Sequence, residues 1–227
     1  MALRKLEPGA LVGEQVFDAI HGAIMSGDLP AGHRLRIRDL AAELGTSVMP
    51  VREAIRRLEE NGLAEAIPYK GAVVKGFTLE ELLHVYAVRR LLEVEATRLG
   101  AAAVTAPMLD DMRFEYRSMR EALAEGRIAD YLDHDERLLA LLYAASGNPV
   151  LVEMIRTLWR RCRSYKIVGA QRAVESGESA LLWTYQEKLL EAASAHDPDA
   201  AARISDDSVA AATERIRATL VGSFHVS

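Results

Sequence analysis

The sequence has few of the features of exported or membrane-bound proteins. Its 227 residues include one cysteine, Cys162, so the chain cannot form an internal disulfide, which is usual in a reducing compartment. The N-terminal residues contain no apolar run of the kind found in signal peptides. No stretch reaches the ~18 apolar residues that a membrane span requires. These absences predict a cytoplasmic protein that does not enter a membrane.

An excess of positive charge is also missing. The chain has 28 lysines and arginines and 33 aspartates and glutamates, which gives a net charge of -5. The residues before Phe77 contain equal numbers of both kinds, so the acidic excess lies in the rest of the chain. This balance excludes a protein coated in positive charge. The neutral N-terminal part can still bind nucleic acid if its basic residues share one face.

The first third of the chain predicts a helix, a helix-turn-helix and a hairpin. Apolar residues recur at helical spacing, and glycines and prolines interrupt them. Ser47 can cap the third helix, and Pro50 falls in its first turn, where a missing N–H costs nothing. This order is typical of a winged helix-turn-helix. The expected elements are helices over about 11–26, 38–44 and 48–61, and strands over 63–67 and 72–77.

From Thr78 onward the pattern is helical throughout, without strand-like alternation. The joints between the expected helices are short, so consecutive helices should pack as antiparallel neighbours in a bundle. We therefore expect a mainly α protein with two domains, a winged helix-turn-helix over 1–76 and an all-helical domain over 77–227. The six expected helices cover about 78–102, 106–125, 127–146, 149–174, 178–196 and 198–221.

The helix over 48–61 has an apolar stripe and a basic face. Arg52 and Arg56 lie one turn apart outside the stripe, so their guanidinium groups can face one partner, such as phosphates or guanine edges. Alternatively, both arginines pair with glutamates of the same helix on a solvated face. The preceding turn and following hairpin favour the DNA-binding interpretation. The stripe that we expect to pack on the core consists of Val48, Val51, Ile55 and Leu58.

Two motifs, GDLPAGHRL and MPVREAIRRLEENGL, resemble the DNA-binding domain of the GntR regulators. The resemblance implies a winged helix-turn-helix that binds double-stranded DNA. Val48 stands where many relatives have an arginine. Because we place it on the core stripe, we expect it to make no DNA contact and the base preference to differ. The implied operator-contacting residues are Arg38, Ser47, Met49, Arg52 and Gly71.

Two further residues extend this candidate DNA-binding set. Arg56 follows Arg52 on the same face of the expected helix. Lys70 lies beside Gly71 at the tip of the hairpin, where the missing side chain of glycine lets backbone approach closely.

The rest of the chain resembles the FCD effector domain of the FadR-like branch. The resemblance is carried by VRRLLEVEATRLGA over 88–101, AASGNPVL over 144–151 and KLLEAASAHDPDAA over 188–201. It implies a domain that binds a small-molecule effector and forms a homodimer. A two-fold dimer would match a palindromic operator.

Four of the expected bundle helices each direct a polar group toward the apolar interior. These groups are Arg89, Asp135, Gln186 and Ser208. A buried carboxylate needs a partner, and Arg89 is the candidate partner for Asp135. The groups either line an effector cavity or are structural polar groups satisfied within the core. Their coincidence on four helices favours the cavity.

The resemblance also implies a metal site, formed in most relatives by an aspartate and three histidines. The aspartate position corresponds to Asp135. The histidine positions correspond to Leu139, Gln186 and Ser208, which are poor ligands or none. We therefore predict no metal cofactor. Asp130 and His134 have i,i+4 spacing but lie off the inward stripe, so they are a weak alternative pair.

A pocket without metal must recognise its ligand by charge and hydrogen bonds. Arg89 would anchor a carboxylate or phosphate, and Asp135 and Gln186 would read hydroxyl or amide groups. The first bundle helix also has a second apolar stripe that can face a partner subunit. This stripe consists of Val85, Val88, Leu92 and Leu99.

The sequence predicts a ligand-responsive, dimeric DNA-binding regulator, with repression favoured over activation. One alternative is a DNA-binding protein that senses nothing and has a structural C-terminal bundle. A second alternative is an enzyme with His134, Asp135 or Glu136 as acid or base. The chain has no nucleophile elbow, phosphate loop or closed metal constellation to support the enzyme.

Overall fold

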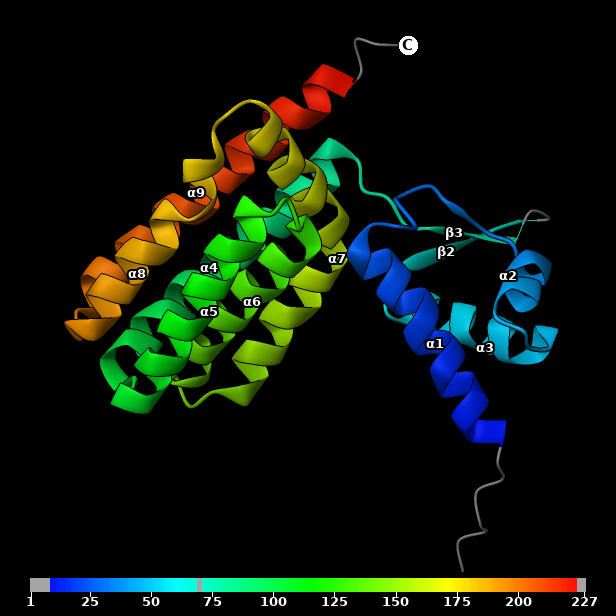
Figure 1. The fold of residues 1–227 in the computed structure, drawn as a ribbon, viewed down its shortest axis with the longest axis horizontal. Coiled ribbons are helices and arrows are strands. Elements are labelled where there is room, and N and C mark those ends of the chain that lie inside the picture. The colour runs from blue at the N-terminus through cyan, green and yellow to red at the C-terminus, as the bar shows by residue number, and fades with distance from the viewer. Residues whose placement is uncertain (1–8, 69–70, 224–227) are drawn as a thin grey trace, which may run out of the picture. The chain divides into compact units, whose positions relative to one another are not determined.

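A computed structural model describes residues 9–68 and 71–223 of the chain. The chain divides into two compact units, residues 1–76 and 77–227 (Figure 1). The described part of the first unit contains three helices and three strands. In chain order these are α1 (Gly9–Ser26), β1 (Arg34–Leu35), α2 (Ile37–Glu43), α3 (Val48–Glu60), β2 (Ala64–Ile67) and β3 (Gly71–Val74).

The small sheet has one strand more than the expected hairpin. Strands β2 and β3 form the antiparallel hairpin, with Ala64 opposite Val74. The short β1 pairs with the other edge of β3, with Arg34 opposite Val73, so the strand order is β1-β3-β2. A strand of two residues is too short for a period, so only the pairing reveals it. It connects the segment before α2 to the wing.

Helix α3 packs an apolar face against α1 and the sheet. Its buried residues are Val51, Ala54, Ile55 and Leu58. The expected stripe was wrong at one end, because the side chain of Val48 is 37% exposed. Val48 is the first residue of α3, at the end of the helix, and its side chain is not covered by the core. From α1, the packing partners are Val16, Ile20 and Ile24.

The second unit is a bundle of helices. A capping box begins α4: the Thr78 hydroxyl accepts a hydrogen bond from the amide of Glu81, and the Glu81 side chain accepts one from the amide of Thr78. Within the described residues, no helix is both long and apolar enough to cross a bilayer. The helices are α4 (Leu79–Ala103), α5 (Ala106–Ala124), α6 (Ile128–Ala144), α7 (Pro149–Glu175), α8 (Thr184–Ser194) and α9 (Pro198–Ser223).

The helix expected over 178–196 is divided in the structure. A short 3₁₀ helix, η1 (Ser179–Leu182), precedes α8, and Trp183 between them departs from helical geometry with φ -131°. The carbonyl of Leu182 accepts a hydrogen bond from the Tyr131 hydroxyl at 2.8 Å. This contact from a distant helix satisfies a carbonyl that a continuous helix would satisfy internally, so sequence periodicity could not predict the break.

Helices α4 and α6 approach closely at a glycine. A Cβ built on Gly100 would lie 2.0 Å from the carbonyl oxygen of Leu142. Any side chain there would force the two helices apart. Gly100 therefore sets the distance between the helices that carry Arg89 and Asp135.

Candidate functional site

A shallow groove on the first unit gathers several of the residues expected to contact DNA. Arg38 comes from α2, Arg52 from α3 and Gly71 from the start of β3. The turn between α2 and α3 and the β1–β3 pairing bring these three segments together. The groove is lined by Leu35, Arg36, Ile37, Arg38, Asp39, Val48, Arg52 and Gly71.

The two arginines of the recognition helix differ in their partners. The Arg56 guanidinium forms ion pairs with Glu60 at 2.9 Å and Glu53 at 3.3 Å, which is the solvated-face arrangement considered above. Arg52 is exposed, and the described residues place no carboxylate within ion-pair distance of it. Of the two, Arg52 is the side chain whose charge is not already balanced.

The N-terminal end of α3 exposes two further expected residues. Ser47 occupies the N-cap position but makes no side-chain cap hydrogen bond, so its hydroxyl is not used within the helix. Met49 is 70% exposed. Backbone N–H groups at a helix N-terminus also favour anions such as phosphate.

At the start of β3, Gly71 offers the groove its backbone rather than a side chain. Gly71 has φ +87°, a conformation that favours glycine, and a Cβ there would meet no atom closer than 3.9 Å. Glycine is therefore favoured here by the backbone conformation and not by a lack of space for a side chain. Lys70, also expected to contact DNA, lies outside the described residues.

The groove includes residues that the sequence interpretation missed or misplaced. Arg36 lines it and pairs with Asp39 at 3.6 Å across an exposed i,i+3 step. Val48, expected in the core, lies in the groove instead. The sequence did contain a signal that Val48 is exposed. It directly follows the N-cap residue Ser47, and residues at a helix end are often less buried than those in its middle.

A cavity in the second unit brings together all four residues expected to contact an effector: Arg89 from α4, Asp135 from α6, Gln186 from α8 and Ser208 from α9. The cavity has a volume of about 90 Å³. That is room for several water molecules, and hence for a small organic ligand. Leu139, which stands where the family resemblance implies a metal ligand, also lines it.

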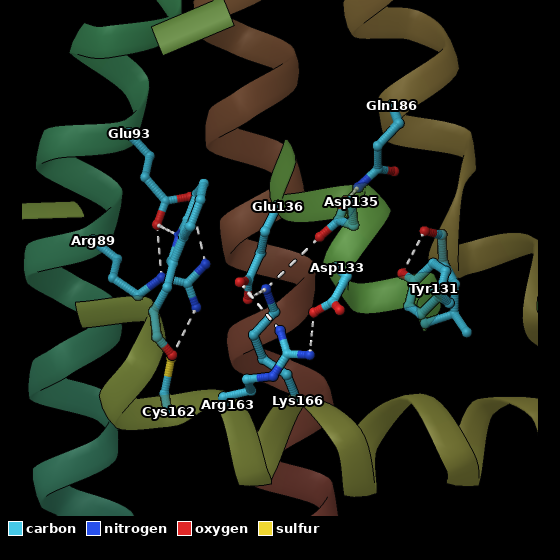
Figure 2. A network of polar contacts seen from close by, with 12 residues as sticks. Arg89, Glu93, Tyr131, Asp133, Asp135, Glu136, Cys162, Arg163, Lys166 and Gln186 are labelled. Atoms are coloured by element: carbon cyan, nitrogen blue, oxygen red, sulfur yellow. Dashed lines mark hydrogen bonds and ion pairs between the residues drawn. The ribbon is translucent and has the colours of Figure 1, made fainter. Parts of the chain in front are cut away.

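The expected pairing of Arg89 with Asp135 was wrong. Arg89 pairs along its own helix with Glu93, through Nε to Oε1 at 2.6 Å and Nη2 to Oε2 at 3.4 Å (Figure 2). Glu93 also accepts hydrogen bonds from Trp159 Nε1 at 2.9 Å and the Tyr143 hydroxyl at 3.3 Å. The i,i+4 spacing along one helix brings Glu93 to Arg89 without help from another helix.

Asp135 has two partners from other helices. Its Oδ1 accepts a hydrogen bond from Gln186 Nε2 at 2.6 Å, and its Oδ2 lies 3.7 Å from the Lys166 ammonium. Burial raises the pKa of Asp135 above its usual value, and Lys166 opposes that rise. Figure 2 shows Gln186 and Lys166 meeting this carboxylate from different helices.

Helix α7 supplies cationic side chains that the sequence interpretation missed. Lys166 Nζ lies 2.9 Å from Glu136 Oε1, and Arg163 pairs with Glu136 at 3.2 Å and with Asp133 at 2.5 Å. Burial alone would raise the pKa of Glu136, but Lys166 and Arg163 outweigh it and the pKa is lowered. The sequence did contain a signal for Lys166. It falls at helical spacing among the buried residues Trp159, Cys162 and Ala170 of α7, which predicts a side chain that faces the interior.

Helix α9 adds Arg215, which the sequence interpretation also missed. Ser208 and Arg215 are seven residues apart, so they lie on one face, and both line the cavity. In the described part of the chain, no carboxylate pairs with Arg215. Sequence inspection could have found it two turns beyond Ser208.

The cavity residues do not fit the metal site implied by the relatives. Leu139 has no donor atom, Gln186 and Ser208 are weak ligands, and Lys166 brings an ammonium to Asp135. Residues 9–68 and 71–223 hold no group of three or more metal-ligating side chains. The alternative pair is also engaged elsewhere: Asp130 with Arg127, and His134 Nδ1 with Glu115 at 2.6 Å.

The chain matches two protein families. Residues 12–74 match the family described as "Bacterial regulatory proteins, gntR family", and residues 84–211 match the FCD domain. The chain belongs to the GntR regulators that carry an FCD domain. It is therefore a DNA-binding transcription regulator and not an enzyme, and the enzyme alternative raised above is excluded.

Sequence relatives are regulators too. The chain is 28% identical to the Escherichia coli K12 regulator McbR over 65% of this chain and 66% of that protein. It is 38% identical to a Paenarthrobacter nicotinovorans protein described as a "probable D-xylose utilization operon transcriptional repressor", over 51% of this chain and 50% of that protein. The chain thus spans between half and two thirds of these relatives.

Solved structures share the fold. Escherichia coli McbR/YncC aligns with a TM-score of 0.74 at 25% identity, covering 94% of this chain and 98% of that one. A GntR regulator from Rhodococcus sp. RHA1 aligns with a TM-score of 0.78 at 23% identity, covering 91% and 97%. The mainly α architecture with a winged helix-turn-helix is confirmed.

Proposed function

We propose that this regulator is a homodimeric repressor that binds a palindromic operator and releases it when a small metabolite enters the bundle cavity. The observation that carries the operator site is the exposed Arg52, unpaired among the described residues, in one groove with Arg38 and Gly71. A guanidinium without an internal partner is free to bind phosphate or guanine edges. Ser47, Met49, Arg56 and Lys70 complete the proposed contact set.

The dimer is proposed to form through an apolar face of α4 and α7. Val85, from the stripe expected to face a partner, is already buried within the bundle, but Val88 is exposed. Val88 continues into an apolar groove with Val150 and Met154, of which Val150 is 68% exposed. Contiguous apolar surface of this kind is typical of interfaces. A second copy of the chain is the proposed occupant, because two-fold assembly would present two recognition helices to two half-sites.

The effector is proposed to act without a metal and to contact Arg89, Asp135, Gln186 and Ser208, which line one cavity. Since Arg89 is held in place by Glu93, it contributes a fixed, positively charged part of the cavity wall and does not need to move when the ligand binds. The ligand shifts operator affinity only if it binds one arrangement of the DNA-binding units better than another.

Fluorescence anisotropy with DNA from the gene's own upstream region tests the operator site. Arg52→Ala should weaken binding by about 1–3 kcal/mol, roughly 5- to 150-fold, and leave the melting temperature unchanged. Arg56→Ala is the matched control, with a smaller loss because Glu53 and Glu60 already neutralise Arg56. A folded Arg52→Ala protein that binds as tightly as the parent would refute the assignment.

Light scattering after size-exclusion chromatography tests the dimer. Met154→Glu places a charge in the apolar groove and should yield monomers, whereas Glu153→Gln at the same groove should leave dimers intact. A Met154→Glu protein that remains dimeric would place the interface elsewhere.

A further inference from the structure

The charged groups of the cavity are balanced with one exception. Arg89 pairs with Glu93, and Lys166 pairs with Asp135 and Glu136. The remaining cation of the lining is Arg215, which has no ion pair within the described residues. The anion that the sequence interpretation assigned to Arg89 therefore has a better-suited partner on α9.

The hydrogen-bonding groups of the cavity also have an exception. The amide nitrogen of Gln186 donates to Asp135, and a carboxylate only accepts, so this contact fixes which way the amide faces. Gln186 Oε1 is then left buried without a donor. The other buried side-chain atoms without partners, in Thr97 and Arg161, belong to residues outside the cavity lining. Buried acceptors are normally satisfied, so an absent donor points to a ligand.

From these two exceptions we propose that the cavity binds, without a metal, a small organic anion that also carries a hydrogen-bond donor. Arg215 binds the carboxylate or phosphate, and Gln186 Oε1 accepts from a hydroxyl or N–H of the same ligand. This inference rests on the proposed effector role of the cavity and adds the chemistry of the effector to it.

Lys166 explains why no metal is needed. Its ammonium lies 3.7 Å from Asp135 and 2.9 Å from Glu136, so a fixed positive charge stands beside the carboxylate at which the family resemblance implies a metal. A divalent cation at Asp135 would be repelled by this ammonium and would lack further ligands. The cavity of about 90 Å³ restricts the ligand to a few carbon atoms unless the helices move.

Isothermal titration calorimetry of the full-length protein, dialysed against EDTA, tests the ligand chemistry. The probes are 2-hydroxy acids of three to six carbons, the plain carboxylic acids of the same lengths, and the matching neutral 1,2-diols. At least one hydroxy acid should bind about tenfold more tightly than its plain acid and its diol, a difference of about 1.4 kcal/mol. Equal binding of hydroxy and plain acids, binding that requires added zinc or manganese, or no binding in the series would overturn the proposal.

Variants assign the two contacts. Arg215→Gln should weaken the hydroxy acid about tenfold, while Arg217→Gln, which removes a surface charge paired with Glu214, should have no effect. Gln186→Leu should abolish the preference for hydroxy acid over plain acid, with Glu187→Gln as its control. Thermal melts check that each variant folds, and the parent's ligand series decides the chemistry even if Gln186→Leu does not fold.

A parallel anisotropy titration with operator DNA separates this inference from the effector role. If a neutral or metal-dependent compound releases the DNA while the hydroxy acids do nothing, the effector role stands and the ligand chemistry proposed here is wrong. If the hydroxy acids bind as expected but operator affinity does not change, the ligand chemistry stands and the regulatory role of the cavity fails.

Discussion

The two units of this regulator use arginine in opposite ways. On α3, Arg52 is exposed and unpaired within the described chain. On α4, Arg89 is buried and held by Glu93, with the Tyr86 ring beneath it at 4.4 Å. A water-exposed guanidinium costs little to leave free, whereas a buried one requires a fixed counter-charge. An exposed arginine such as Arg52 can therefore stay available to a partner, whereas a buried one such as Arg89 is committed to the fold.

This contrast predicts that substitutions in the bundle change stability and substitutions in the groove change DNA affinity. The largest effect is expected at Glu93. Glu93→Gln leaves Arg89 buried without a counter-charge and should lower the free energy of unfolding of the bundle by about 3 kcal/mol or more. Urea unfolding followed by tryptophan fluorescence measures it, since both tryptophans, Trp159 and Trp183, lie in this unit.

Glu95→Gln is the matched control on the same helix. Its partner Arg98 is exposed, so the loss should stay within about 0.5 kcal/mol. Adding Arg89→Met to Glu93→Gln should restore part of the stability, because the uncompensated charge is gone. Equal losses at Glu93 and Glu95 would break the distinction between buried and exposed arginines.

Packing gives the next largest effect. Gly100→Ala would force its new methyl against the Leu142 carbonyl and should destabilise the bundle by about 1–3 kcal/mol. Gly169→Ala in α7 meets no atom within 4 Å and should gain up to about 1 kcal/mol from helix propensity. Thermal melts of the two variants should move in opposite directions.

In the groove, Arg38→Ala should weaken operator binding about tenfold, or about 1.4 kcal/mol, with no change in unfolding. If Arg38 contacts phosphate, the slope of log affinity against log salt should fall by about one. Anisotropy titrations at several salt concentrations measure both quantities. An Arg38→Ala protein that loses stability but no affinity would show that this exposed arginine serves the fold.

Val48→Arg sharpens the comparison from the other side. Because Val48 is partly exposed in the groove, the arginine should be accommodated at a cost of less than about 0.5 kcal/mol. It should also raise affinity for DNA severalfold with a steeper salt dependence. A Val48→Arg protein that fails to fold would instead indicate that Val48 belongs to the core.

The smallest effect concerns pH. Because burial raises the pKa of Asp135 in the folded protein, ionisation of this carboxyl opposes folding as pH rises through that raised value. Asp135→Asn, which keeps an acceptor for Gln186, should therefore gain stability relative to the parent as pH increases from 4 to 8. Urea titrations at the two pH values measure the difference. A relative gain that is larger at pH 4 would reverse the assigned sign.

Local patterns predicted most elements because each depends on neighbouring residues. The helical patterns placed α1, α2, α3 and five of the six bundle helices close to their observed bounds. The four inward polar residues were found from the same periodicity, and all of them line one cavity. The two-residue β1 and the break at Trp183 were not predictable, since both arise from contacts with distant segments.

The sequence by itself determined most of the secondary structure and which polar residues face inward, because helical periodicity depends on residues only three or four positions apart. It did not determine which inward charges meet. Arg89 and Glu93 pair within α4 at i,i+4 spacing. The contacts of Asp135 with Lys166 and Gln186, and the absence of an ion pair at Arg215 among the described residues, required the packing of four helices. Ion pairs between helices depend on distances of a few ångströms, and only the tertiary structure decides those.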